Sequence, residues 1–179
     1  MDVPYKTKYK NQYMFKKVSI LVLLFFFVSC SFEAPKEFSE KALNEKLYNL
    51  KDIDSTLQEV LDQYKGKKVL IDVWASWCRD CVAGMPKVKE LQKEFKEVVF
   101  LFLSVDERVD SWKRGVKRYK VKGEHYNLPK GMKNGDLVEF LNVSWIPRYI
   151  VVNEKGEITL FNATDALDKD IITALKKAI

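Results

Sequence analysis

The sequence predicts an α/β fold, in which a mixed central sheet carries helices on both faces. Two β-branched and almost continuously apolar runs, VLIDVWA (69–75) and VVFLFLSV (98–105), are typical of strands buried on both faces. A segment with apolar residues at steps of three and four follows each run, so strands and helices alternate. Two further strands joined by a tight turn (148–163) and a closing helix complete the sheet and add antiparallel pairing to it.

Composition and charge favour one packed domain with additional segments. The chain has 179 residues, of which 47% are hydrophobic and 13% aromatic. Its net charge of +6 is concentrated at the N-terminus, because residues 1–29 carry five lysines and one aspartate. Elsewhere lysine and glutamate interleave as on a solvated surface. The densest basic run, 113–123, is expected to be the polar face of a helix, so we predict no nucleic-acid partner.

The N-terminal segment has the features of an export signal. Residues 14–30, MFKKVSILVLLFFFVSC, are basic, then apolar, then small, which is the order of a secretory signal. The apolar core, 18–28, is shorter than the roughly 20 residues that cross a membrane. Cys30 follows a small residue, and this resembles a bacterial lipoprotein signal in which Cys30 is lipidated. The alternative is a plain signal peptide, and Met14 is a second candidate start beside Met1.

The residues after Cys30 predict where the domain lies. SFEAPKEFSE has no apolar period and indicates a tether. A lipidated cysteine followed by a tether would hold the domain outside the cytoplasm beside a membrane, where disulfides persist. The predicted division is a leader at 1–30, a tether at 31–40 and a domain at 41–179.

The elements of the domain follow from periodicity and turn residues. Lys41–Tyr64 has apolar residues at steps of three and four, among them Leu43, Leu47 and Leu50, so one or two helices are expected and 41–66 is predicted to be a helical extension. The remaining elements are expected to be a strand at 69–75, a helix at 81–95, a strand at 98–105, a helix at 110–119, mostly loop at 123–133, a short helix at 136–141, strands at 148–153 and 158–163, and a helix at 167–179.

The two cysteines of WCRDC lie where a buried strand gives way to a helix. Free N–H groups and the helix dipole at that position lower the pKa of a thiol. Arg79 adds a positive charge beside Cys78, and Asp80 partly opposes it. Cys81, one turn later, can close a short disulfide with Cys78 and is expected to be the more buried of the two. By themselves these features leave a redox pair, soft metal ligands and a structural disulfide open.

Two segments resemble a known family. VLIDVWASWCRDC is similar to the active-site strand and turn of thioredoxins, and NVSWIPRYIVVNEKGEI is similar to the segment that carries their cis-proline. The longer gap between the segments resembles the TlpA/ResA-like members, which are membrane-anchored and extracytoplasmic and carry an insertion there. The resemblance covers about residues 69–179. It implies a thioredoxin-like fold with an insertion between the CxxC helix and the cis-proline.

The resemblance also implies roles for individual residues. Cys78 would attack a partner's disulfide, and Cys81 would resolve the mixed disulfide. Pro147 would be cis and face the cysteines, while the backbone of Ile146 would pair with the substrate chain. Asp72 would lie buried beneath the pair with a raised pKa and accept the proton of Cys81. The alternative for Asp72 is a satisfied buried acid without a catalytic part.

Further residues are expected to form the substrate groove. Trp77 would line it. Arg79 and Asp80 replace the Gly-Pro of thioredoxins, so the redox potential of that family does not carry over. Trp145 stands where relatives have a small residue, and it would either narrow the groove or pack against the protein.

The resulting prediction is an extracytoplasmic thiol–disulfide oxidoreductase that reduces protein disulfides. Its expected partners are protein thiols and disulfides, an unidentified membrane electron donor or acceptor, and the membrane through lipid on Cys30. We expect a monomer without cofactor or metal. A thiol-dependent peroxidase is an alternative, disfavoured because Ala75 stands where such enzymes have Thr or Ser. A copper-binding or delivery module is another, disfavoured by the cysteine spacing and the single histidine.

Overall fold

The computed structural model describes residues 33–177. Cys30, the leader and the first two residues of the tether lie outside the described residues, so export and lipidation stay predictions. Among the helices that the structure describes, none is long and apolar enough to cross a membrane.

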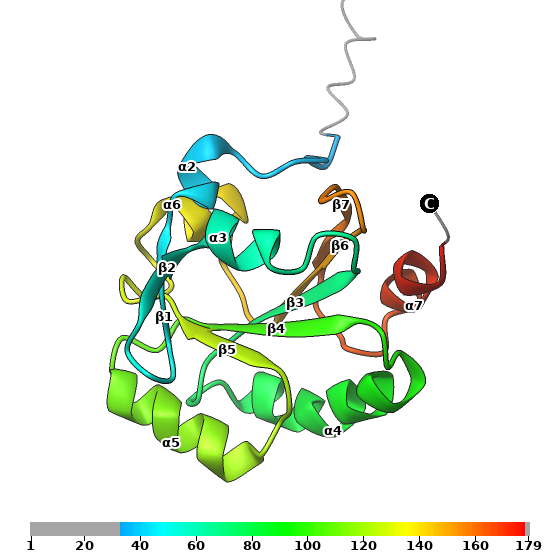
Figure 1. Cartoon of the computed structure of the whole chain (residues 1–179). Helices are drawn as coiled ribbons and strands as arrows, with labels where there is room; N and C mark the ends of the chain where they lie inside the picture. The colour runs from blue at the N-terminus through cyan, green and yellow to red at the C-terminus, as the bar shows by residue number, and fades with distance from the viewer. Residues whose placement is uncertain (1–32, 178–179) are drawn as a thin grey trace, which may run out of the picture. The chain divides into compact units, whose positions relative to one another are not determined.

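A mixed sheet forms the centre of the molecule (Figure 1). Its strands are β1 (Lys46–Asn49), β2 (Asp54–Thr56), β3 (Val69–Trp74), β4 (Val99–Ser104), β5 (Glu124–Asn127), β6 (Arg148–Val152) and β7 (Ile158–Ala163). The order across the sheet is β2-β1-β5-β4-β3-β6-β7. β3 is parallel to β4 and antiparallel to β6, and all its residues are buried. The predicted mixed sheet is therefore confirmed.

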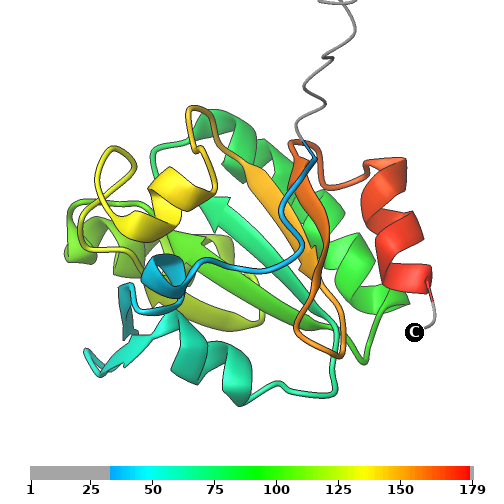
Figure 2. The same cartoon turned by 90° about the horizontal axis from the view of Figure 1, so that it is seen from above.

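Helices cover both faces of this sheet, as predicted. They are α2 (Glu40–Leu43), α3 (Leu57–Asp62), α4 (Arg79–Glu94), α5 (Val109–Tyr119), α6 (Asp136–Phe140) and α7 (Lys169–Lys176). Figures 1 and 2 show α4, α5 and α7 on one face and α2, α3 and α6 on the other. α5, β5 and α6 lie between α4 and Pro147, where the insertion was expected.

The expectation of a purely helical segment at 41–66 is wrong. α2 and α3 are present, but β1 and β2 form a hairpin between them, and β1 also pairs with β5. The side chain of Asn49 accepts hydrogen bonds from the amides of Lys51 and Ile53, and Asp52 has a positive φ of 61°. These residues favour a turn between β1 and β2. β1 also finds backbone hydrogen-bond partners on the free edge of β5, and the apolar spacing along the sequence does not reveal this pairing.

The expectation of loop at 123–133 is also wrong in part, because β5 lies there. β5 extends the sheet beside β4, with Phe102 opposite His125. Gly123 leads into it with a φ of 141°, and a Cβ at this position would lie 2.5 Å from the carbonyl oxygen of Phe100. The four residues of β5 are mostly polar and show no strand pattern in the sequence, so they are extended because they pair with β4. The other predicted elements are confirmed, with ends shifted by up to three residues.

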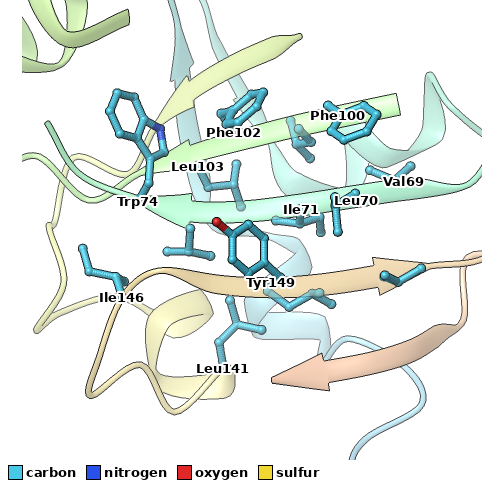
Figure 3. Close-up of a cluster of buried hydrophobic side chains, with 14 of the residues drawn as sticks. Val69, Leu70, Ile71, Trp74, Phe100, Phe102, Leu103, Leu141, Ile146 and Tyr149 are labelled. Atoms are coloured by element: carbon cyan, nitrogen blue, oxygen red, sulfur yellow. The ribbon is translucent and has the colours of Figure 1, made fainter. Parts of the chain in front are cut away.

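The core is built around β3 and its neighbours, as Figure 3 shows. The register pairs Trp74 with Ser104 of β4 and Val73 with Arg148 of β6. The ends of β3 and β4 and the beginning of β6 therefore meet at one edge of the sheet. The segments that follow β3 and precede β6 carry the predicted site residues.

The hairpin provides a matched test of the fold. Leu47 is completely buried, whereas Leu50 in the same hairpin is 41% exposed. Replacing Leu47 by Ala should lower the free energy of unfolding by about 2–5 kcal/mol, because a buried leucine leaves a cavity. Leu50→Ala should cost less than about 1 kcal/mol. Urea denaturation of both variants measures the difference, and equal losses would contradict the hairpin.

Candidate active site

Cys78 and Cys81 lie at the beginning of α4, directly after the loop that leaves β3. Their sulfurs form a disulfide with an S–S distance of 2.09 Å. Cys78 is the N-cap of α4, and its Sγ accepts a hydrogen bond of 3.1 Å from the Cys81 amide. Cys78 is 6% exposed and Cys81 2%, so Cys81 is the more buried, as predicted. In the reduced protein this amide and the helix dipole would stabilise a thiolate on Cys78.

A buried carboxylate holds the loop in front of Cys78. Asp106, which follows β4, accepts hydrogen bonds from the backbone amide and the hydroxyl of Ser76 at 2.8 and 2.7 Å. It accepts a third from the hydroxyl of Ser104 at 2.7 Å. A Cβ on Gly115 of α5 would lie 2.7 Å from the Cβ of Ser76, so only glycine permits this approach. Ser76 is thus fixed from two sides, two residues before Cys78.

The sequence reasoning missed this clamp. Asp106 and Ser76 were not singled out, although one signal was available. Polar side chains that follow a buried strand lie at the edge where loops of α/β sheets form sites. Ser104 and Asp106 at the end of an apolar strand fit that description.

The segment before β6 faces the disulfide. The peptide bond between Ile146 and Pro147 is cis, which confirms that prediction. The carbonyl oxygen of Ile146 lies 3.6 Å from the Sγ of Cys78. In the disulfide this sulfur has no hydrogen to donate, and reduction to a thiol would supply one. Residues far apart in the sequence therefore meet at one sulfur atom.

Asp72 is a buried acid on β3, on the side of the sheet that α4 covers. It is 3% exposed and lies directly opposite Tyr149 of β6. Directly opposed residues share a face, and a Cβ on Gly84 of α4 would come within 3.3 Å of the Tyr149 hydroxyl. The Oδ1 atom of Asp72 has no hydrogen-bond partner among the described residues. Burial raises the pKa of Asp72 to about 8. At least one oxygen of this acid is therefore not satisfied, and its catalytic part stays a prediction.

The residues expected to form a groove lie on the surface. Trp77 is 63% exposed and Trp145 60%, so Trp145 does not pack into the core. Arg79 and Asp80 are exposed in the first turn of α4. The structure thus surrounds a buried disulfide with exposed aromatic and charged side chains.

A cavity of about 340 Å³ opens beside this arrangement. Asp80 and Gly84 of α4 line one side, and Trp145, Pro147 and Tyr149 line another. Lys87 and Asp165 also line it and form an ion pair. The cavity lies close to the disulfide, because Pro147 lines it and the carbonyl oxygen of the preceding residue, Ile146, lies 3.6 Å from the Sγ of Cys78.

Asp72 should make stability depend on pH. Its pKa is about 8 in the folded chain and about 4 when unfolded, so between these values the native state binds more protons. Its contribution to the free energy of unfolding should therefore fall as pH rises from 4 to 8, by up to about 1.4 kcal/mol per pH unit, and then level off. Asp72→Asn should remove this fall. Urea denaturation of the oxidised unmodified protein and the oxidised Asp72→Asn variant at pH 5 and 8 gives their free energies of unfolding. If the difference between the two free energies is the same at both pH values, the raised pKa of Asp72 is refuted.

Comparison with known proteins gives consistent results. A family model described as thioredoxin-like matches residues 66–158, just over half of the chain. The thiol-disulfide oxidoreductase ResA from Bacillus cereus is 26% identical over 155 residues, which cover 83% of this chain and 86% of that protein. The thioredoxin-like protein YneN from Bacillus subtilis is 30% identical over 122 residues, with coverage of 66% and 67%.

A solved structure has the same fold. The thioredoxin domain of a thiol-disulfide oxidoreductase from Bacteroides vulgatus matches with a TM-score of 0.62 at 21% identity, over 78% of this chain and 100% of that one. The family model, the sheet and the cysteine pair facing a cis-proline agree with the resemblance seen in the sequence. The chain belongs to the thioredoxin-like family.

Proposed function

We propose that the chain is an extracytoplasmic thiol–disulfide oxidoreductase that reduces disulfides of protein substrates through Cys78 and Cys81. The observation that carries the proposal is the disulfide at the start of α4, with the Ile146 carbonyl 3.6 Å from Cys78. A relative that is 26% identical is named a thiol-disulfide oxidoreductase, which supports the reaction class.

The reaction begins with the reduced pair. The thiolate of Cys78 attacks one sulfur of the partner's disulfide, so a mixed disulfide forms and one partner thiolate leaves. The thiolate of Cys81 then attacks the Sγ of Cys78, which releases the second partner thiolate and closes the Cys78–Cys81 disulfide. Two electrons and two protons pass from the pair to the partner. A membrane thiol donor would restore the dithiol by the same exchange in reverse.

Asp72 is the proposed proton acceptor in the second step. The buried Cys81 must lose its proton before it can attack, and Asp72 lies in the same α4-covered layer of the protein. Burial raises the pKa of Asp72 to about 8, well above that of an ordinary aspartate, so its carboxylate is a stronger base than usual and suited to accept a proton.

The surrounding residues are proposed to bind the partner chain. The backbone of Ile146 would pair with an extended segment, and Trp77 and Trp145 would flank it with apolar surface. Arg79 and Asp80 would lie against the same segment from α4. Such contacts would hold a partner's sulfur in line with Cys78.

Substitution of each cysteine separates their roles. Cys78→Ser should abolish reduction of insulin disulfides, because the attacking thiolate is lost. Cys81→Ser should retain the first step and accumulate a mixed disulfide, which non-reducing electrophoresis detects. If Cys78→Ser reduced insulin at the rate of the unmodified protein, attack by the Cys78 thiolate would be contradicted.

Export and anchoring are tested through Cys30. Lipidation of Cys30 would place the protein in the membrane fraction of bacterial cells, facing away from the cytoplasm. Cys30→Ala should block incorporation of labelled palmitate, whereas Cys81→Ala, which removes a cysteine of the domain, should leave the label in place. Equal labelling of the Cys30 variant and the unmodified chain would rule out this anchor.

A further inference from the structure

We propose that the cavity between α4 and the segment after Pro147 binds an arginine or lysine side chain of the polypeptide substrate, next to the substrate's reactive cysteine. This inference rests on the proposed function and specifies its substrate class. The cavity measures about 340 Å³. Its wall contains Asp80, between the two cysteines, and Pro147, next to the carbonyl that touches Cys78. A partner whose sulfur reaches Cys78 therefore brings its neighbouring residue to the cavity.

The charges around the cavity favour a cation. Lys87 donates hydrogen bonds to both carboxylate oxygens of Asp165 at 3.0 and 3.1 Å, so their charges offset each other. Asp80 is exposed, and its carboxylate has no ion pair or hydrogen bond with the side chains or backbone of residues 33–177. One negative charge thus remains at the mouth of the cavity, where a guanidinium or ammonium group can pair with it.

Tyr149 supplies a polar group inside the cavity that has no partner of its own. The residue as a whole is 1% exposed, and its hydroxyl makes no hydrogen bond with another residue that the structure describes, so it is free to bond to whatever occupies the cavity. The hydroxyl lies at the wall formed by Gly84, where a Cβ would approach it to 3.3 Å, so the glycine leaves this wall open. Figure 3 shows Tyr149 extending from β6 toward β3. A hydroxyl oxygen can accept a hydrogen bond, so an N–H group of a ligand in the cavity can donate one to Tyr149 in place of solvent.

Trp145 adds an aromatic wall. Its side chain is 60% exposed and lines the cavity, so an indole face is available to a ligand. A guanidinium can stack on an aromatic face while it donates hydrogen bonds in its plane, which favours arginine over lysine. An acidic side chain would be repelled by Asp80, and an apolar one would leave the Tyr149 hydroxyl without a partner.

Peptide substrates test the subsite directly. Disulfide-linked peptides would differ only in the residue beside the cysteine, which is Arg, Lys, Gln or Glu, with one series for each side of the cysteine. In one series kcat/KM for reduction should be about three- to tenfold higher for Arg than for Gln, and lower for Glu than for Gln. The Arg preference should shrink with added salt. Equal kcat/KM values across both series would overturn the proposal.

Variants connect the preference to the cavity. Asp80→Asn and Trp145→Ala should each reduce the Arg-to-Gln ratio, and Asp80→Asn should reduce it more, because the charge pair is lost. Asp170→Asn is the matched control. Asp170 is an exposed acid in the first turn of α7 and is absent from the cavity wall, so its removal should leave the ratio unchanged. An unchanged ratio in Asp80→Asn would refute the role of this carboxylate.

A binding measurement separates the subsite from the redox function. Peptides with Ser in place of Cys would be titrated into the oxidised protein and followed by NMR. The Arg peptide should shift the indole N–H of Trp145 and the ring signals of Tyr149 more than the Gln peptide does. If the Ser peptides cause these shifts but the protein reduces none of the disulfide-linked peptides, the subsite is preserved and the proposed function is rejected. Reduction of every peptide at one rate, with identical shifts, would reject the subsite alone.

Discussion

The active site depends on the position of β3, which lies parallel to β4 and antiparallel to β6. This arrangement brings the ends of β3 and β4 and the beginning of β6 to one edge of the sheet. The loop to Cys78, the clamp residue Asp106 and the cis peptide before Pro147 lie at that edge because their strands end or begin there. A shift of β3 by one residue in this register would turn Asp72 to the opposite face, away from α4 and Tyr149.

Two buried aspartates near this edge have opposite environments. Asp106 accepts hydrogen bonds from Ser76 and Ser104, so its carboxylate is satisfied and holds a loop in place. Asp72 has an oxygen without a partner, and burial raises its pKa to about 8. The first is suited to positioning the attacking cysteine and the second to exchanging a proton near neutral pH. The same residue type thus has two different environments because its hydrogen-bond partners differ.

The rim of the site differs from its interior. The disulfide is buried, whereas Trp77, Trp145 and Asp80 present exposed aromatic and negative surface around it. The exchange of electrons between sulfurs needs only the interior, so discrimination between partners falls to the rim. Under the proposed function, the Arg79-Asp80 pair, in place of Gly-Pro, would bear on both the redox couple and the choice of substrate.

The sequence by itself determined the elements with strong local patterns and the residues with unmistakable chemistry. The apolar runs of β3, β4 and β6, the cysteines at the start of α4, the buried Asp72 and the cis Pro147 were all predicted. Only the tertiary structure decided β1, β2 and β5, because edge pairing rather than periodicity makes those segments extended. It also decided the Asp106 clamp and the cavity at Tyr149, because the groups that form them are distant in the sequence and meet only when the sheet assembles.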